Sequence, residues 1–280
     1  MEVIFKKLLP KFLPILFFLS AVLVSDPVLA KSGCYNNAIV DIKTSFIKKL
    51  SRKLDHGDII FAACKPSPVH IDQTYAVFIT QRTKQICANE CNYNLIFLLA
   101  DNAGNKIRYL YIKENALLSS TRIIQNVTID TDIYQLNPFL RAVGIRIEKR
   151  KPVHSIQTYS NELHLFIEDG KTFRPLFYND DEKHLKTLSA LSMKEVEKSK
   201  QKNNNIDNTC NLYRNESIRT IEFGDYHNGF RDLIIKSNII NILGLKEKDG
   251  CAEQKIASTS GQTVIPYDGY YYRLPDWLRN

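Results

Sequence analysis

Apolar and polar residues alternate with a period of two along much of the chain, which is the pattern of β-strands with one buried face. The clearest example is the stretch 163–177, LHLFIEDGKTFRPLF, in which Leu163, Leu165 and Ile167 share one face. At its centre, Asp169-Gly170 supplies the positive φ angles that a tight hairpin turn requires. This stretch therefore predicts a β-hairpin.

The same pattern of two apolar runs around a turn recurs at 95–112 and at 263–272, where Asp268-Gly269 marks the turn. Shorter β-branched or apolar runs predict further strands at 59–64, 75–80, 122–129, 142–147, 218–223 and 230–237. The three hairpins differ in spacing, so a regular repeat architecture is not supported. The expected fold is mainly β, with antiparallel hairpins that form a β-sandwich-like domain and a smaller C-terminal β domain.

One or two helices are also expected. Between residues 39 and 50 apolar side chains recur at helical spacing with lysines on the other face, which suits core packing or contact with an anionic membrane. A second, short helical pattern covers 184–196, and it leads into the polar run KSKQKNNNIDN. We expect a solvated helix and a flexible linker there. The predicted domains are 31–180 and 209–280, with the helix and linker at 181–208 between them.

Residues 1–30 have the features of a secretory signal peptide, with Lys6 and Lys7 before an apolar run and Val28-Leu29-Ala30 at its end. Cleavage is expected after Ala30, because the apolar run is short for a membrane span and contains proline. A retained anchor and a lipoprotein attached at Cys34 are the alternatives, although a charged Lys31 does not suit a lipidation signal. The predicted location is the periplasm or the exterior, with no transmembrane segment after cleavage.

All six cysteines lie beyond the expected cleavage point, and an even number of cysteines in an exported chain predicts three disulfides. Proximity in the chain favours Cys34–Cys64, Cys87–Cys91 and Cys210–Cys251, although the sequence does not determine the connectivity. A zinc site at 87–91 is the competing interpretation of that pair, but no second pair of ligands lies at zinc spacing.

The net charge of the whole chain is +8, and cleavage would remove three lysines and two acidic residues to leave +7. This charge favours anionic surfaces or acidic partners, or it serves solubility alone. An exported chain is not expected to meet nucleic acid.

The oxygen-rich run 225–232, DYHNGFRD, resembles part of a calcium loop, with Asn228 and Asp232 as its weak candidate ligands. Gly224 and Tyr226 occupy positions where such a loop needs carboxylates. We therefore expect a structural turn, no metal and no cofactor.

This run contains Asn228-Gly229-Phe230-Arg231-Asp232-Leu233, and Tyr267-Asp268-Gly269-Tyr270-Tyr271 follows some forty residues later. The pair resembles a C-terminal module of exported bacterial proteins of uncharacterised function, over residues 210–280. The run 57–65, GDIIFAACK, is similar to the opening of such proteins. The resemblance implies a periplasmic β-rich protein and supplies no catalytic residues.

The last fourteen residues are rich in the side chains that anchor interfaces, and alternation is expected to bury about half of them. The predicted binding residues are Tyr267, Tyr270, Tyr271, Tyr272, Arg273 and Trp277. No Gly-x-Ser-x-Gly motif or metal-binding histidine spacing is present. The leading hypothesis is a periplasmic binding or inhibitory protein, of an immunity type, that masks an envelope protein partner. The alternatives are an envelope hydrolase whose residues meet only in three dimensions, and a structural envelope protein.

Overall fold

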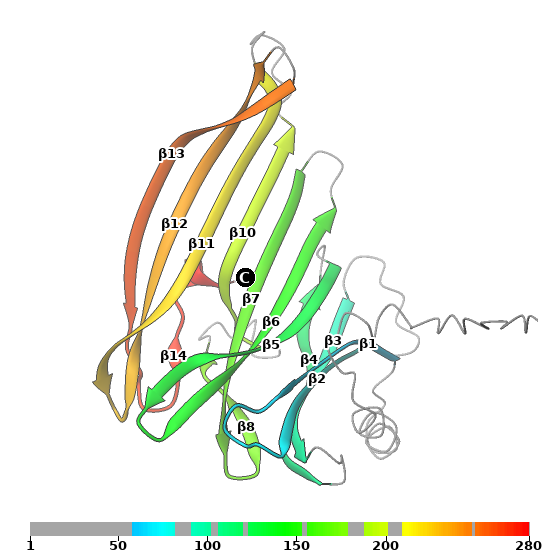
Figure 1. The fold of residues 1–280 in the computed structure, drawn as a ribbon, viewed down its shortest axis with the longest axis vertical. Helices are drawn as coiled ribbons and strands as arrows, with labels where there is room; N and C mark the ends of the chain where they lie inside the picture. The colour runs from blue at the N-terminus through cyan, green and yellow to red at the C-terminus, as the bar shows by residue number, and fades with distance from the viewer. Residues whose placement is uncertain are drawn as a thin grey trace, which may run out of the picture.

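A computed structural model of the chain describes residues 58–81, 91–101, 106–119, 123–152, 156–178, 188–200, 209–247 and 250–279. These residues are almost entirely β-strands in antiparallel sheets (Figure 1), which confirms the predicted fold class. The expected signal peptide and the expected helix at 39–50 lie outside the described residues. No helix among the described residues is long and apolar enough to cross a membrane.

The first sheet is a four-stranded meander in which each strand pairs with the next along the chain. Its strands are β1 (Asp58–Pro66), β2 (Gln73–Gln81), β3 (Cys91–Asp101) and β4 (Ile107–Ser119). Both faces of β2 and β3 are buried, which explains why their sequences are continuous apolar runs instead of alternating ones.

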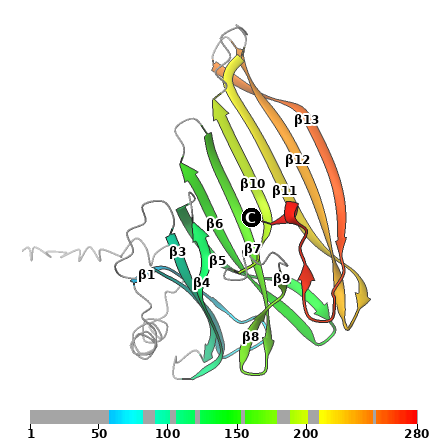
Figure 2. The same cartoon turned by 180° about the vertical axis from the view of Figure 1, so that it is seen from behind.

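The second sheet has eight strands in the order β13-β12-β11-β10-β7-β6-β5, with β8 paired to the last four residues of β7. Its long strands rise well beyond the first sheet (Figures 1 and 2). The strands are β5 (Ile123–Asn137), β6 (Leu140–Pro152), β7 (Ile156–Asp169), β8 (Thr172–Pro175), β10 (Leu191–Lys200), β11 (Thr209–His227), β12 (Phe230–Glu247) and β13 (Gly250–Ile265).

The chain ends in a short segment that packs against this second sheet. In it, β14 (Tyr272–Arg273) pairs in parallel with β9 (Phe177–Tyr178), and the 3-10 helix η3 (Asp276–Leu278) follows. One apolar cluster surrounds this segment and includes Leu165, Leu233 and Tyr272. The C-terminal segment is therefore part of the core and not a tail.

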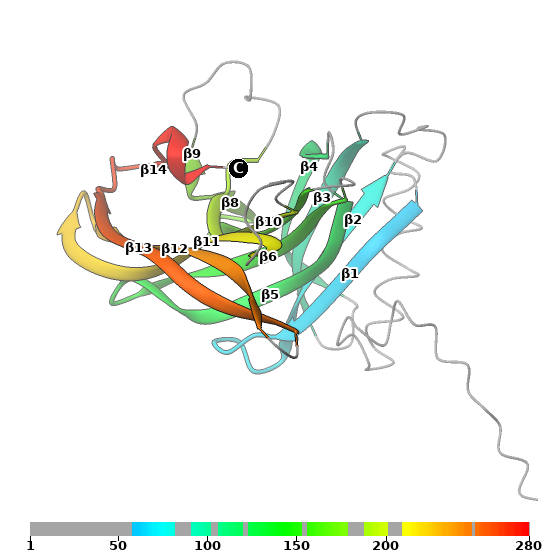
Figure 3. The same cartoon turned by 90° about the horizontal axis from the view of Figure 1, so that it is seen from above.

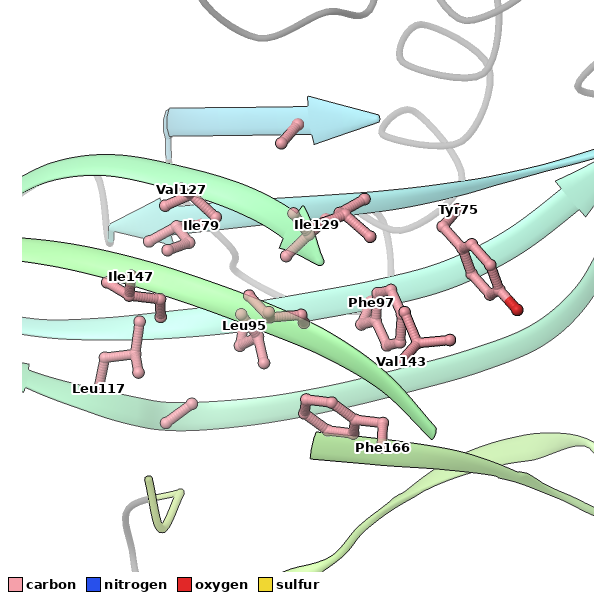
Figure 4. Packing of buried hydrophobic residues seen from close by; sticks show 14 of the residues in the cluster. Tyr75, Ile79, Leu95, Phe97, Leu117, Val127, Ile129, Val143, Ile147 and Phe166 are labelled. Atoms are coloured by element: carbon pink, nitrogen blue, oxygen red, sulfur yellow. The ribbon is translucent and has the colours of Figure 1, made fainter. Parts of the chain in front are cut away.

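The other main cluster lies between the two sheets (Figure 4). Phe97 of β3 is fully buried there, and its ring lies 4.2 Å from that of Phe173 and 5.3 Å from that of Phe166, measured between centroids. Aromatic pairs at such distances add to the stabilisation from burial. These rings tie β3 to β7 and β8, so the predicted hairpin at 163–177 is also the contact between the sheets.

The predicted hairpin is confirmed as β7 and β8, with Gly170 at a φ of 63° in the turn. The predicted hairpin at 263–272 is only partly correct. Tyr267 and Tyr272 face each other across the Asp268-Gly269 turn, but β14 then joins β9 and not β13.

The helix predicted at 184–196 is wrong for its last six residues, which form the start of β10. This strand pairs with β7 on one side and β11 on the other, so sheet hydrogen bonds outweigh the helical preference of the sequence. The second sheet contains strands from both predicted domains, with β10 paired between β7 and β11.

Candidate functional site

The aromatic residues predicted to bind a partner divide into two groups. Tyr267 and Tyr272 are buried, with exposed fractions of 3% and 0%, whereas Tyr270 and Trp277 are each 54% exposed. Arg273 is exposed and Tyr271 is partly buried. The buried pair belongs to the core, so the candidate surface has to be built from the other four.

The two buried tyrosines hold the C-terminal segment in place. The ring of Tyr267 stacks on that of Phe230 at a centroid distance of 4.4 Å, and the Tyr272 hydroxyl donates a hydrogen bond of 2.6 Å to the carbonyl oxygen of Arg231. Both partners come from the start of β12. The Asn-Gly-Phe-Arg-Asp run and the Tyr-Asp-Gly-Tyr-Tyr run are therefore two halves of one contact.

Two polar side chains of the Asn-Gly-Phe-Arg-Asp run form hydrogen bonds with the backbone of Tyr267, one with its carbonyl oxygen and one with its amide. The side-chain nitrogen Nδ2 of Asn228 donates to the Tyr267 carbonyl oxygen at 3.0 Å, and the backbone amide of Tyr267 donates to Asp232 Oδ1 at 3.2 Å. The other carboxylate oxygen of Asp232 lies 2.6 Å from His227 Nδ1. We call Asn228, Asp232 and Tyr267 the backbone clamp.

The clamp accounts for the two candidate calcium ligands. Both oxygens of Asp232 already have partners, and Asn228 contributes its amide nitrogen to the clamp. Among the described residues there is no group of three or more histidine, cysteine, aspartate or glutamate side chains arranged to hold a metal ion. Asn228 also adopts a φ of 50°, a left-handed value that suits the turn before β12.

Beside the clamp, exposed and partly buried tyrosines and arginines form a compact group, which we call the Tyr–Arg cluster. The rings of Tyr178 and Tyr271 stack at 4.9 Å, and Tyr270 meets Tyr271 edge-on at 4.6 Å. The guanidinium carbon of Arg174 lies 4.4 Å from the centroid of the Tyr270 ring, and that of Arg273 lies 5.7 Å from the centroid of the Tyr178 ring. These cation–π contacts hold the five side chains together at the surface.

Asp268 fixes the turn that carries the cluster. Its Oδ1 accepts hydrogen bonds from the amides of Tyr270 and Tyr271 at 2.8 and 2.7 Å, and its Oδ2 accepts one from Arg273 Nε at 2.8 Å. The Tyr271 amide is the main cause that lowers the pKa of Asp268, with help from Tyr270 and Arg273. The carboxylate is therefore charged at neutral pH and keeps the exposed rings in place.

Trp277 lies apart from this cluster, in η3. The Trp277 carbonyl oxygen accepts a hydrogen bond of 3.5 Å from the Arg219 guanidinium of β11. The backbone of Arg279 forms an isolated antiparallel β-bridge with Leu191 at the start of β10. The structure thus brings Tyr270, Tyr271 and Arg273 together, adds Arg174 and Tyr178 from β8 and β9, and leaves Trp277 elsewhere. Pattern reasoning missed Arg174 and Tyr178 because they are about 100 residues away in the chain.

A second candidate site is a cavity of about 160 Å³ between the β1–β2 loop and the β5–β6 turn. Inside it, His70 Nε2 lies 3.3 Å from the Glu168 carboxylate, and the Tyr75 hydroxyl donates to the same carboxylate at 3.2 Å. Burial raises the pKa of Tyr75, so the phenol remains a hydrogen-bond donor. The other lining residues include Asp132 and Arg141.

The loop that presents His70 is ordered by its own hydrogen bonds. The Ser67 hydroxyl accepts from the amides of Val69 and His70 at 3.3 and 3.0 Å, and the Ser67 amide donates to the Gln73 carbonyl oxygen at 2.9 Å. No local sequence pattern pointed to this site, because its three polar groups come from the loop, β2 and the end of β7.

The residues Lys149, Glu162 and His164 form a buried polar group on β6 and β7. Lys149 Nζ lies 2.7 Å from Glu162 Oε1, and both side chains are less than a tenth exposed. His164 Nδ1 is 3.1 Å from the Ser189 carbonyl oxygen, while Nε2 has no hydrogen-bond partner. Burial and then Lys149 lower the pKa of His164 to about 3, so the imidazole is neutral at physiological pH.

Cys64 and Cys91 are each disulfide-bonded. Their predicted partners, Cys34 and Cys87, lie outside the described residues. Cys210 and Cys251 lie on β11 and β13, with β12 between these two strands. All three predicted pairings remain predictions.

Comparison of this chain with protein-family models, with curated proteins and with solved structures gave no match. The geometry of the candidate sites is therefore the basis for the function proposed below.

Proposed function

We propose that this chain is an exported envelope protein, periplasmic or secreted, that binds and masks a partner protein with fixed stoichiometry, in the manner of an immunity protein or inhibitor. The observation that carries the proposal is the Tyr–Arg cluster. Tyrosine and arginine are the residue types that most often dominate interface energetics. Here they stand together at the surface, on a turn held by Asp268.

The rigidity of the cluster matters as much as its composition. Binding costs free energy when flexible side chains become ordered, so an interface whose rings are already stacked loses less. Arg174 lies over the Tyr270 ring, which meets Tyr271 edge-on, and the Arg174 guanidinium also donates to the Tyr270 carbonyl oxygen. These contacts order the side chains of the cluster before a partner binds.

The chemistry of the cluster favours an acidic partner surface. The cluster carries two guanidinium groups, those of Arg174 and Arg273, and the Arg273 side chain is 57% exposed. A guanidinium has only hydrogen-bond donors, which suit carboxylate acceptors. The net positive charge of the chain supports the same preference. Export through the expected signal peptide and the predicted disulfides suit an envelope protein.

Affinity capture from envelope extract tests the proposal. The tagged chain, exported with its own leader and purified under oxidising conditions, is expected to retain a single partner in fixed ratio, identified by mass spectrometry. The double substitution Tyr270→Ala with Tyr271→Ala should weaken capture at least tenfold, as hot-spot truncations do.

Tyr226→Ala is the matched control, because Tyr226 is a similarly exposed tyrosine, 51% against 54%, that also packs under an arginine, Arg231. Trp277→Ala tests the part of the predicted surface that lies away from the cluster. Unchanged capture by the Tyr270/Tyr271 variant would rule out the proposed surface.

A second candidate function is envelope hydrolysis, favoured by the pair of His70 and Glu168 in a cavity. A histidine oriented by a carboxylate can act as a general base toward a water molecule, and the Tyr75 hydroxyl can donate a hydrogen bond to a substrate oxygen after leaving Glu168. Screening with ester, amide and glycoside substrates tests this function. Activity that is lost in both His70→Asn and Glu168→Gln supports hydrolysis, and activity that persists in both variants argues against this site.

A further inference from the structure

Within the part of the chain that the structure describes, the outer edge of β13 is unpaired. β13 is the terminal strand of the eight-stranded sheet, and no described strand pairs with its outer side (Figures 1 and 3). Every residue from Glu253 to Gln262 is exposed. An edge strand presents a row of unpaired N–H and C=O groups, which makes it a template for another strand.

From Ala257 to Ile265, β13 also lacks the features that usually protect an edge. The ten residues from Ile256 to Ile265 include no charge and no proline. The one irregularity in its pairing with β12 is a bulge at Ile256, since Asn241 pairs with Ala257 and Ile242 with Lys255, and the pairing is regular from Ala257 to Ile265. Natural edges are normally blunted by charge, proline, bulges or a covering element.

The opposite edge of the same sheet shows this protection. The pairing of β5 with β6 contains three irregularities along its length, and Asp130 and Asp132 lie in the middle of β5. In addition, β5 packs against β1 of the first sheet. The contrast indicates that the exposure of β13 is specific to that edge.

We propose that β13 pairs in antiparallel fashion with β13 of a second copy of this chain, about a twofold axis that passes through Ser260. In this register Ile256, the residue at the bulge, comes to lie beside Val264 of the second copy, and the arrangement occurs twice. Both side chains are 52% exposed in the single chain. Pairing them across strands gives each an apolar neighbour, which is the arrangement that stabilises antiparallel sheets.

The remaining positions of this register are compatible with close pairing. Ser258 faces Gln262, Thr259 faces Gly261, and Lys255 faces Ile265, so no two like charges meet. The small side chains at the centre allow the strands to approach. A second copy is the occupant that this sequence fits, because one segment supplies both halves of each matched pair.

The symmetry also explains why the assembly would stop at two copies. A twofold contact uses the same edge of both chains, and the protected β5 edge differs from it in shape and charge. The proposal therefore predicts a closed dimer with one continuous sheet and not a fibre.

Sedimentation analysis of the purified chain over a range of concentrations tests the proposal. We expect a reversible monomer–dimer equilibrium. Ile256→Lys and Val264→Lys should each raise the dimer dissociation constant by about tenfold or more, because symmetry applies each loss twice. Ile123→Lys on β5 is the matched control, since Ile123 is 53% exposed, and it should leave the equilibrium unchanged.

A charge-exchange pair tests the register itself. The double substitution Ile256→Lys with Val264→Glu places opposite charges across the interface at both matched positions, so dimerisation should recover relative to either single variant. Double Ile256→Lys with Val264→Lys places like charges there and should give a monomer. Circular dichroism of each variant checks that the fold is intact.

A wild-type chain that is monomeric at every concentration, or a dimer equally weakened by Ile123→Lys, overturns the proposal. Failure of the charge exchange to restore the dimer overturns the register. Capture of an envelope partner through the Tyr–Arg cluster is measured separately, so the loss of either result leaves the other standing.

Discussion

The region between the two sheets and the upper half of the ladder β11–β13 are both antiparallel β-structure, yet their surroundings differ. β3 is buried on both faces over most of its length, whereas residues 253–262 of β13 are all exposed. The first region encloses the stacked rings of Phe97 and Phe173, and the second is rich in serine, threonine and glutamine. Packed side chains between the sheets therefore stabilise this fold, whereas the exposed part of β11–β13 provides solvent-accessible surface.

The largest difference between the regions is expected for truncation of a buried ring. Phe97→Ala should lower the free energy of unfolding by about 3–5 kcal/mol, since it leaves a cavity among Tyr75, Phe166 and Phe173. Ile239→Ala on the ladder, where the side chain is 38% exposed, should cost less than about 1 kcal/mol. Urea unfolding of both variants measures the contrast. Equal losses would mean that the ladder is as firmly packed as the core.

The buried ion pair is expected to come next. Lys149→Met would leave the Glu162 carboxylate buried beside His164 without its cation, at a cost of about 3 kcal/mol. The exposed pair Lys236–Glu222 on the ladder provides the comparison, and Lys236→Met should change stability by less than about 1 kcal/mol. Chemical denaturation distinguishes the two, and similar effects would refute the role given to burial.

The backbone clamp joins the ladder to the packed region, and its loss should have an intermediate effect. Asp232→Ala removes the acceptor of the Tyr267 amide inside the protein and should cost about 1–3 kcal/mol. Limited proteolysis near the C-terminus should speed up along with the loss of stability. Added calcium should not protect the wild-type chain, and protection by calcium would revive the metal hypothesis for Asn228 and Asp232.

The last effect concerns acid. His164 has a pKa of about 3 in the folded protein, against 6.5 for an ordinary histidine, so the unfolded chain binds a proton more readily between these values. Stability is then complete above pH 6.5 and falls as the pH drops towards 3, by at most about 1.4 kcal/mol per pH unit. Denaturation curves at pH 7, 6 and 5 should show this slope, and His164→Gln should flatten it. An unchanged slope would assign the acid sensitivity to other groups.

Pattern reasoning succeeded where neighbouring residues determine the structure. The alternation around Asp169-Gly170 predicted the β7–β8 hairpin, and alternation in the last residues indicated that some of the tyrosines are core and others exposed. It failed at 191–196, where helical spacing on a polar segment suggested a helix. There the open hydrogen-bonding edges of β7 and β11 decide the outcome, and no local pattern reveals those edges.

The candidate sites show the same limit more strongly. His70, Tyr75 and Glu168 converge only because the β1–β2 loop comes to lie beside the end of β7. Arg174 and Tyr178 join Tyr270 and Tyr271 because β9 pairs with β14. Each of these groups depends on contacts between segments about 100 residues apart.

The sequence by itself determined the strand-rich fold class, the turns marked by Asp-Gly and Asn-Gly, and the concentration of aromatic residues at the C-terminus. These features follow from side-chain period and backbone preference, which act over a few residues. The tertiary structure alone decided which tyrosines are buried, which carboxylate meets His70, and which strand lies open at the edge of the sheet. Burial and strand order result from packing distant segments together, and that packing selects one arrangement among the many that local preferences permit.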